Sequence, residues 1–200
     1  MREKQYIIGI TGNTGSGKST VTGMLKALGA VTMDADAITR KLQEPGAKGY
    51  LGIKAHFGSQ YFLDDGRLDR KALGALVFGD QEKLKQLNAI IHPLVTAELE
   101  RQTEGATGII VWDIPLLFES GMDKRCDSIW LVQAPETVRK ERIMARDGIT
   151  TADAEIRMKN QKELASGQAD VVIKNDGDMD ELFLQVKRAF DGIKRKVEHI

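Results

Sequence analysis

The strongest indication of the fold of this 200-residue chain is the segment Gly12-Asn13-Thr14-Gly15-Ser16-Gly17-Lys18-Ser19. It matches the phosphate-loop pattern G-x-x-x-x-G-K-[ST] at every fixed position. The apolar run at residues 6–10 lies directly before it, and residues 19–28 follow with helical spacing. A strand before the loop and a helix after it are the context that supports this motif. The alternative, a glycine turn that binds nothing, does not account for the full match.

The chemistry of such a loop is the binding of a phosphate chain. Its glycines let backbone N–H groups turn inward, and the following helix adds the partial positive charge of its N-terminus. Lys18 can reach the β- and γ-phosphates, and the hydroxyl of Ser19 can ligate Mg²⁺. We therefore expect ATP and Mg²⁺ to bind here. The expected nucleotide-binding residues of the loop are Asn13, Thr14, Gly15, Ser16, Gly17, Lys18, Ser19 and Thr20.

Outward from the loop, short apolar runs alternate with helical stretches, which is typical of a parallel sheet flanked by helices. The runs do not alternate with polar residues, as expected of strands that are buried on both faces. The pattern predicts an α/β fold of the P-loop type with a five-stranded parallel sheet. The expected strands are residues 6–10, 30–33, 109–112, 128–132 and 171–173.

The domain organisation follows from where this pattern changes. Between the second and third expected strands, β-branched runs are scarce and apolar residues recur at helical spacing. We interpret the chain as a single P-loop kinase domain. Its expected parts are a core over about residues 1–36, 106–139 and 166–200, a helical acceptor-binding insertion over about 37–105 and a basic helical lid over about 140–165. The expected helices are 19–28, 70–78, 81–91, 136–146, 153–164 and 180–196.

Composition excludes several classes of protein. Lys and Arg total 29 and Asp and Glu total 29, so the formal net charge is zero and a nucleic-acid partner is not expected. Hydrophobic residues make up 42% of the chain, which is too much for a disordered protein. The single Cys126 leaves no disulfide framework within the chain, and no apolar run is long enough to span a membrane. We expect a cytoplasmic protein without an obligatory protein partner, in which Cys126 and His56 are structural.

Among phosphate-loop proteins, the sequence favours a small-molecule kinase. A GTPase would need the base-reading string N-K-x-D, and the nearest strings, at residues 160–163 and 174–176, do not fit. A motor or transporter ATPase would need a longer chain. What remains is a class in which one short domain binds ATP, an insertion binds the acceptor and a basic lid closes.

An acidic pair at the end of the second expected strand could activate the acceptor. Asp34 and Asp36 lie at the carboxyl end of a strand, where open α/β sheets bind their ligands. A carboxylate there can accept the proton of an acceptor hydroxyl. The alternative is that one of the two only caps the following helix. We favour Asp36 over Asp34 as the base.

Three further residues are candidates for the nucleotide site. Arg142 and Arg146 lie one turn apart on a predicted helix and could clamp the transferred phosphate. The alternative is a basic helix face that is exposed to solvent, which is what most such runs of basic residues form. Asp113 ends the third expected strand and could hold Mg²⁺ or its bound water; equally, it could cap a turn.

With these residues in place, the chain resembles the dephospho-coenzyme A kinase family over nearly its whole length. The loop alone is shared with many proteins, but the ordered set of further motifs is specific. It comprises Met33-Asp34-Ala35-Asp36 with Arg40, Glu44-Pro45-Gly46, residues 65–70, Leu87-Asn88, Ile91-His92-Pro93, Pro115-Leu116-Leu117-Phe118-Glu119, residues 142–147 and residues 169–175. Asn13 and Thr14 depart from the family's usual Gly-Ile at positions that the general motif leaves free.

The resemblance implies transfer of the γ-phosphate of ATP to the ribose 3′-hydroxyl of dephospho-coenzyme A, the last step of coenzyme A synthesis. It implies that Asp36 is the general base and that Arg142 lies against ATP in the lid. It places Arg70 and His92 on the acceptor side, although His92 before Pro93 could equally start a helix. Asn175 could contact adenine or only turn the chain. The implied acceptor-binding residues are Asp34, Asp36, Arg70, His92, Pro115 and Leu116.

Two other functions share some of these features. A nucleoside, nucleotide or shikimate-type kinase would have the loop and the lid but not the acceptor motifs. A nucleotide-dependent switch would bind ATP and a protein partner, but it needs no base for an organic hydroxyl.

Overall fold

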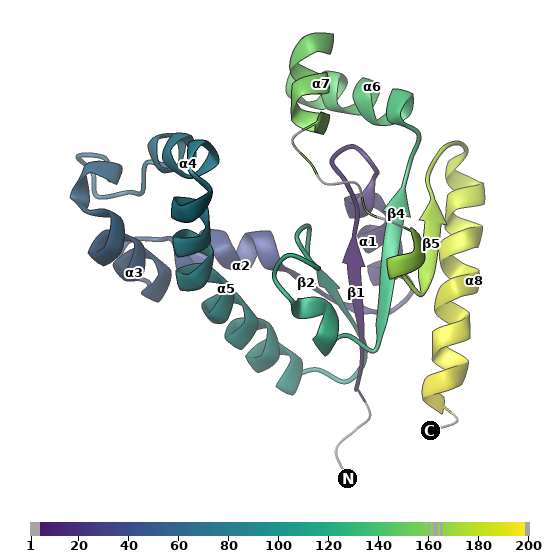
Figure 1. Cartoon of the computed structure of the whole chain (residues 1–200). Coiled ribbons are helices and arrows are strands. Elements are labelled where there is room, and N and C mark those ends of the chain that lie inside the picture. The colour runs from purple at the N-terminus through teal and green to yellow at the C-terminus, as the bar shows by residue number, and fades with distance from the viewer. Residues whose placement is uncertain (1–4, 160, 162–163, 165, 199–200) are drawn as a thin grey trace. The chain divides into compact units, whose positions relative to one another are not determined.

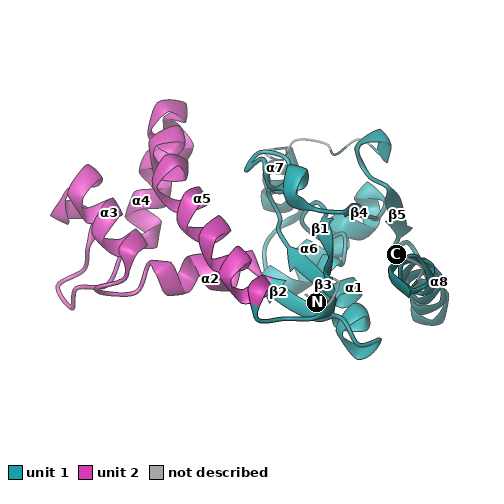
Figure 2. Ribbon diagram, turned by 90° about the horizontal axis from the view of Figure 1, so that it is seen from below, with its two compact units in different colours: residues 1–33, 105–200 teal, residues 34–104 magenta. Residues whose placement is uncertain are grey.

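The computed structural model describes residues 5–159, 161, 164 and 166–198. The chain divides into two compact units, residues 1–33 with 105–200 and residues 34–104, which Figure 2 shows in teal and magenta. Each unit is described by itself. In the described residues, no helix is both long and apolar enough to cross a membrane.

The first unit is built around a five-stranded sheet in the order β2-β3-β1-β4-β5 (Figure 1). Its strands are β1 (Gln5–Thr11), β2 (Val31–Asp34), β3 (Gly108–Asp113), β4 (Ser128–Gln133) and β5 (Val171–Lys174). β1 runs parallel to both β3 and β4, with Ile8 opposite Val111 and Ser128, and β4 runs parallel to β5. The predicted five-stranded parallel sheet is confirmed, and every expected strand lies within one residue of its observed bounds.

Two helices share a hydrophobic core with this sheet. α1 (Lys18–Ala27) and α8 (Met179–Glu198) pack against each other, and α8 lies beside β5 (Figure 1). The buried residues of α8 recur at the spacing of one helical face. Together with Val21 and Leu25 of α1 they cover Trp130 and the aliphatic residues of the strands. These buried residues of α8 are Leu182, Val186, Phe190 and Ile193.

A helical hairpin follows β4. α6 (Glu136–Asp147) ends at Gly148, whose φ of 63° is left-handed, and α7 (Thr151–Lys159) packs against it through Ile143, Ala154 and Met158. Thr150 caps α7, since its hydroxyl oxygen accepts a hydrogen bond from the backbone N–H of Asp153. α7 therefore begins two residues before the predicted start. Of the predicted helix 153–164, residues 160, 162 and 163 lie outside the described residues.

The second unit is helical. It contains α2 (Ala35–Leu42), α3 (Lys48–Phe57), α4 (Arg70–Gly79) and α5 (Gln81–Glu104), and α5 contacts the other three. Short 3₁₀ turns complete the described secondary structure of the chain, at Ser59–Tyr61, Met122–Arg125 and Ser166–Gln168. This arrangement agrees with the helical character predicted for the region after the second strand.

The prediction that a helix ends at residue 91 was wrong, and so was the interpretation of His92 as a helix start. α5 continues through Pro93, which lies in its interior. A proline inside a helix costs about 3 kcal/mol. The buried residues Ile91, Val95 and Leu99 continue one apolar stripe across it, and their burial offsets that cost.

Candidate active site

Two glycines give the phosphate loop its shape. Gly15 and Gly17 have φ values of 81° and 87°, in the left-handed region that favours glycine. A Cβ on Gly17 would clash with Nδ2 of Asn175, and one on Gly15 would lie 2.6 Å from the carbonyl oxygen of Arg139. Both positions therefore need glycine for its conformation and for its size.

The loop presents donors that the protein itself does not use. Among the described residues, the backbone N–H groups of Gly15, Gly17, Lys18 and Ser19 meet no acceptor. The Oγ atom of Ser16 is buried and also lacks a partner in the described part of the chain. Because buried polar groups in proteins are nearly always paired, this cluster of unused donors at the start of α1 fits an anion such as a phosphate chain.

Lys18 is held by a carboxylate of the neighbouring strand. Its ammonium pairs with Oδ1 of Asp113 at the end of β3. The second oxygen, Oδ2, accepts a hydrogen bond of 2.8 Å from the hydroxyl of Thr22. Asp113 is only 8% exposed. Its carboxylate thus binds two side chains of α1 instead of capping a turn, and it orients the lysine that the loop motif requires.

The predicted metal residues fit Mg²⁺ only in company with phosphates. Ser19 and Asp113 offer the oxygen donors that this ion prefers, and no group of three or more His, Cys, Asp or Glu among the described residues could hold a metal ion. Mg²⁺ is usually bound through one or two protein ligands, with phosphates and water completing its octahedron. The donor set is therefore compatible with a magnesium–nucleotide complex.

Arg142 of α6 joins the loop to the end of β5. Its guanidinium donates to the carbonyl oxygens of Gly15 at 3.4 Å, Ser16 at 3.5 Å and Asn175 at 3.1 Å. It also donates to Oδ1 of Asn175 at 3.2 Å. Asn175 is buried, and its own Nδ2 donates to the carbonyl of Ser16 at 2.8 Å. The structure thus brings Arg142 and Asn175 together with the phosphate loop, and the amide of Asn175 bonds to both.

Arg146 behaves differently from Arg142. It donates to both oxygens of its neighbour Asp147, at 2.7 and 2.9 Å. These hydrogen bonds raise the pKa of Arg146 and lower the pKa of Asp147 below its usual value. Asp147 also pairs with Arg157 of α7. The clamp role of Arg146 stays a prediction; its side chain here is paired with Asp147, and the ion pair of Asp147 with Arg157 links α6 to α7.

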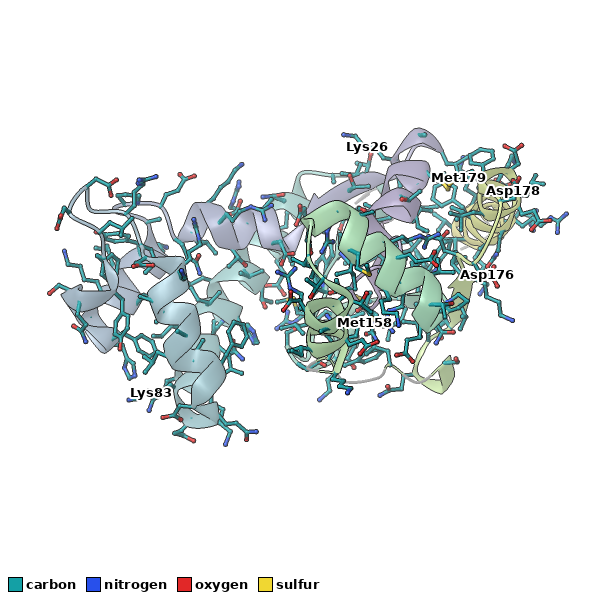
Figure 3. All side chains as sticks on the ribbon, turned by 90° about the horizontal axis from the view of Figure 1, so that it is seen from above. Lys26, Lys83, Met158, Asp176, Asp178 and Met179 are labelled. Carbon is teal, nitrogen blue, oxygen red and sulfur yellow. The ribbon has the colours of Figure 1, made fainter. Side chains whose placement is uncertain are left out.

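A cavity of about 660 Å³ adjoins the loop. It is bounded by the loop, the carboxyl ends of β4 and β5 and the α6–α7 hairpin. Figure 3, seen from above, shows Met158 on α7 and Asp176 after β5, both of which line the cavity. Basic and acidic side chains share its wall with apolar ones. The polar lining residues include Asn13, Ser16, Gln133, Glu136, Arg139, Lys159, Gln161, Lys174 and Asp176.

Pro115 and Leu116 also belong to the first unit. The carbonyl of Pro115 accepts a hydrogen bond of 2.9 Å from the hydroxyl of Thr11, at the end of β1. Leu116 is 53% exposed although it is apolar. The segment is therefore tied to the sheet at Pro115 and presents Leu116 to solvent.

In the second unit, the two strand-end aspartates have different surroundings. Oδ1 of Asp34 accepts the backbone N–H of Ala37 at 2.9 Å, so Asp34 is the N-cap of α2. Its other oxygen lies 3.7 Å from Arg40. Asp36 is exposed in the first turn of the same helix. One member of the pair is thus a cap, which was the alternative to catalysis, and that member is Asp34.

Arg70 and His92 lie on two other helices of this unit. Arg70 starts α4 and donates to Oε1 of Gln43 at 3.1 Å. His92 is half-buried within α5, and burial lowers the pKa of its imidazole. Both remain predicted acceptor-side residues.

Comparison with known proteins identifies the family. A family model described as dephospho-CoA kinase matches residues 6–181. The chain belongs to the dephospho-CoA kinase family. A dephospho-CoA kinase of Symbiobacterium thermophilum is 42% identical over 190 residues, which cover 92% of this chain and 80% of that protein. One from Moorella thermoacetica is 40% identical over 197 residues, covering 95% and 93%. The resemblance drawn from the motifs is confirmed.

Comparison with solved structures agrees with this family assignment. The crystal structure of TT1252 from Thermus thermophilus has a TM-score of 0.82 and 34% identity, covering 97% of this chain and 98% of that one. The dephospho-CoA kinase from Campylobacter jejuni has a TM-score of 0.68 and 26% identity, covering 96% and 99%. A shikimate kinase from Bacteroides thetaiotaomicron, at 13% identity and a TM-score of 0.55 with 94% and 98% coverage, shares the fold alone.

Two residues that bind the phosphate loop were not predicted from the sequence. Arg139 of α6 donates to the carbonyl of Thr14 at 3.0 Å, and the side chain of Gln161 bonds to Thr14 twice. Arg139 lies in the basic helix that the sequence singled out, so it could have been found there. Gln161 belongs to none of the motifs described above, and no residue beside it in the sequence indicates a contact with the loop.

Proposed function

We propose that this kinase transfers the γ-phosphate of ATP to the ribose 3′-hydroxyl of dephospho-CoA, giving CoA and ADP. The observation that carries the proposal is the loop itself, with its unused amide donors and its Asp113-held Lys18, in a chain of the dephospho-CoA kinase family. We also propose a cytoplasmic location, with dephospho-CoA as the acceptor and no protein partner required.

In the proposed mechanism, the phosphate loop positions the nucleotide. The free N–H groups at the start of α1 bind phosphate oxygens, and Lys18 reaches the β- and γ-phosphates. Arg142, already at the loop carbonyls, lies against ATP. Ser19 and Asp113 would hold Mg²⁺, directly or through water, and the bound ion would supply neutralisation of charge on the phosphate oxygens. Little covalent chemistry is required of the protein, so positioning and electrostatics supply the rate.

Asp36 is the proposed base for the acceptor. It orients the 3′-hydroxyl and accepts its proton as the phosphoryl group transfers. The capping bond of Asp34 supports the choice of Asp36 over Asp34 as the base, because a carboxylate oxygen that holds a helix N-terminus is less available to a substrate. We propose that Asp34, Arg70, His92, Pro115 and Leu116 contact the acceptor.

The test mixes the protein with ATP, Mg²⁺ and dephospho-CoA, follows ADP release and weighs the product. We expect dephospho-CoA to gain one phosphoryl group. Lys18→Ala should lose about two to four orders of magnitude in rate, by comparison with the loss of one preorganised charge contact elsewhere. ATP binding without phosphorylation of dephospho-CoA would reject this acceptor, and shikimate and nucleosides would then be tried. Near-normal turnover by Lys18→Ala would reject the assignment of the loop.

A further inference from the structure

Thr14, at the tip of the phosphate loop, is bound through all of its polar groups. Its backbone N–H donates to Oε1 of Gln161 at 2.8 Å, and its hydroxyl oxygen accepts from Nε2 of Gln161, also at 2.8 Å. Its carbonyl accepts from Nε of Arg139 at 3.0 Å. Both partners come from the helical hairpin, Arg139 from α6 and Gln161 from just beyond the end of α7.

The contact with Gln161 is two-pronged. One primary amide meets a donor and an acceptor of the same residue, which fixes its orientation as well as its distance. The second bond depends on a hydroxyl, so an aliphatic side chain at position 14 would make only the first. Thr14 is one of the two loop residues at which this chain departs from the usual family pattern.

The contact leaves the phosphate-binding donors open. Among the described loop residues, the N–H groups of Gly15, Gly17, Lys18 and Ser19 meet no acceptor, whereas the N–H of Thr14 is bound to Gln161. Gln161 therefore does not compete with a phosphate chain for those amides. The bond between Gln161 and Thr14 is compatible with a bound nucleotide and can persist through the reaction.

The hairpin connects this contact to Arg142. α7 packs on α6 through Ala154, Met158 and Ile143, and Ile143 is the next residue after Arg142. A bond that fixes the end of α7 at the loop tip therefore limits the movement of α6 over the loop. Arg142 donates to loop carbonyls at 3.4 and 3.5 Å, distances that a small movement of α6 would break.

We propose that Gln161 is a positioning residue that anchors the α6–α7 hairpin on Thr14 and so keeps Arg142 at the phosphate loop. This deepens the proposed function, on which it rests for the role of Arg142. Gln161 acts through the loop and the hairpin and does not itself touch the reacting atoms.

The experiment compares three variants with the wild-type protein. Gln161→Leu loses both hydrogen bonds, and we expect the affinity for ADP and the kcat/KM for ATP to fall about five- to thirty-fold. Thr14→Val keeps the branched shape but loses the hydroxyl acceptor, so a fall of about threefold is expected. Thr14→Ser keeps a hydroxyl and should retain most of the wild-type affinity. ADP affinity is measured by calorimetry and kcat/KM by ADP release.

Two further measurements separate positioning from a general loss of structure. The double variant Thr14→Val with Gln161→Leu should bind ADP within about twofold of Gln161→Leu alone, because both changes break the same contact. Amide hydrogen exchange of the loop should be faster in Gln161→Leu, since the N–H of Thr14 loses its acceptor. Gln168→Leu, which changes an exposed glutamine in the same connecting segment, is the control and should match the wild type.

The outcomes are decisive even if one variant folds poorly. Unchanged ADP affinity in folded Gln161→Leu, or losses that add in the double variant, would overturn the proposal. If Gln161→Leu does not fold, equal affinities of Thr14→Val and the wild type would overturn it as well. Failure of the wild type to phosphorylate dephospho-CoA, with the ADP results as expected, would reject the proposed function and leave the positioning role standing.

Discussion

Lys18 is not a free cation in this kinase. Its ammonium pairs with Asp113, and Asp113 also binds Thr22 of the same helix. Arg142 is likewise held, by the carbonyls of the loop and the amide of Asn175. At the scale of single residues, the site consists of side chains that hold one another in place. Such preorganisation is what an electrostatic mechanism needs.

Asp36→Asn should lower kcat by about two to four orders of magnitude, because a positioned general base contributes about that much. ATP affinity, measured by calorimetry, should stay within about twofold. Asp80→Asn is a matched control, since Asp80 accepts backbone N–H groups at the start of α5 and asparagine can do the same. A collapse of ATP affinity with normal residual transfer would make Asp36 a nucleotide-site residue instead.

Gly17→Ala should abolish tight ATP binding and lower the free energy of unfolding. The left-handed φ costs about 1–2 kcal/mol for a residue with a Cβ, and the Cβ would also clash with Asn175. Gly29→Ala is the control, because Gly29 has a φ of 101° but no atom within 4 Å of its added Cβ. Urea unfolding of both variants separates the conformational cost from the clash. Equal losses of unfolding free energy in Gly17→Ala and Gly29→Ala would show that the clash with Asn175 is relieved.

At the scale of elements, packing decided the length of α5, while local capping decided where α6 ends and α7 begins. α5 passes through Pro93 because a buried stripe continues on both sides of it. α6 and α7 form a hairpin because Gly148 ends one helix and Thr150 caps the next. The length of α5 contradicted the prediction from local sequence, while the ends of α6 and α7 followed ordinary capping chemistry.

The half-buried imidazole of His92 in α5 predicts a pH effect on stability. Burial lowers the pKa of His92 below its ordinary value of 6.5, so the folded state favours the neutral ring. The stabilisation is therefore present above pH 6.5 and is lost as the pH falls below it. Urea unfolding at pH 7.5 and 5.5 should show a smaller loss in His92→Gln than in the wild type. His56→Gln, which removes an exposed histidine of the same unit, is the control; if it reduces the loss as much as His92→Gln does, the assignment is wrong.

At the scale of the whole molecule, the core of the first unit carries the site. β1, β3, β4 and β5 end near the loop, and α1 and α8 share the core with them. The loop thus begins at one core strand and ends in one core helix. Movements of this core would move Lys18 and Asp113 with it.

Phe190→Ala should lower the free energy of unfolding by about 3–5 kcal/mol, because the ring is 1% exposed and its removal leaves a cavity. Phe183→Ala, on the same helix but 37% exposed, should cost much less. Thermal and urea unfolding measure both. Equal losses would mean that α8 does not pack on the sheet as described.

The strands, the phosphate loop and the family could all be predicted from the sequence. These depend on local patterns, since buried parallel strands need short apolar runs and a phosphate nest needs glycines at fixed spacing. The sequence also predicted Lys18 and Arg142, although their roles stay proposals. The sequence favoured Asp36 over Asp34 as the base, and the structure adds that Asp34 caps α2.

Contacts between residues far apart in the chain could be seen only in the folded structure. Nothing local links Gln161 to Thr14 or Asn175 to Arg142, because each pair is separated by many residues and joined by the folding of the sheet and the hairpin. The length of α5 was decided in the same way, by burial that outweighs a proline. Local chemistry sets which elements form, whereas hydrogen bonds and apolar contacts between elements set where their side chains lie.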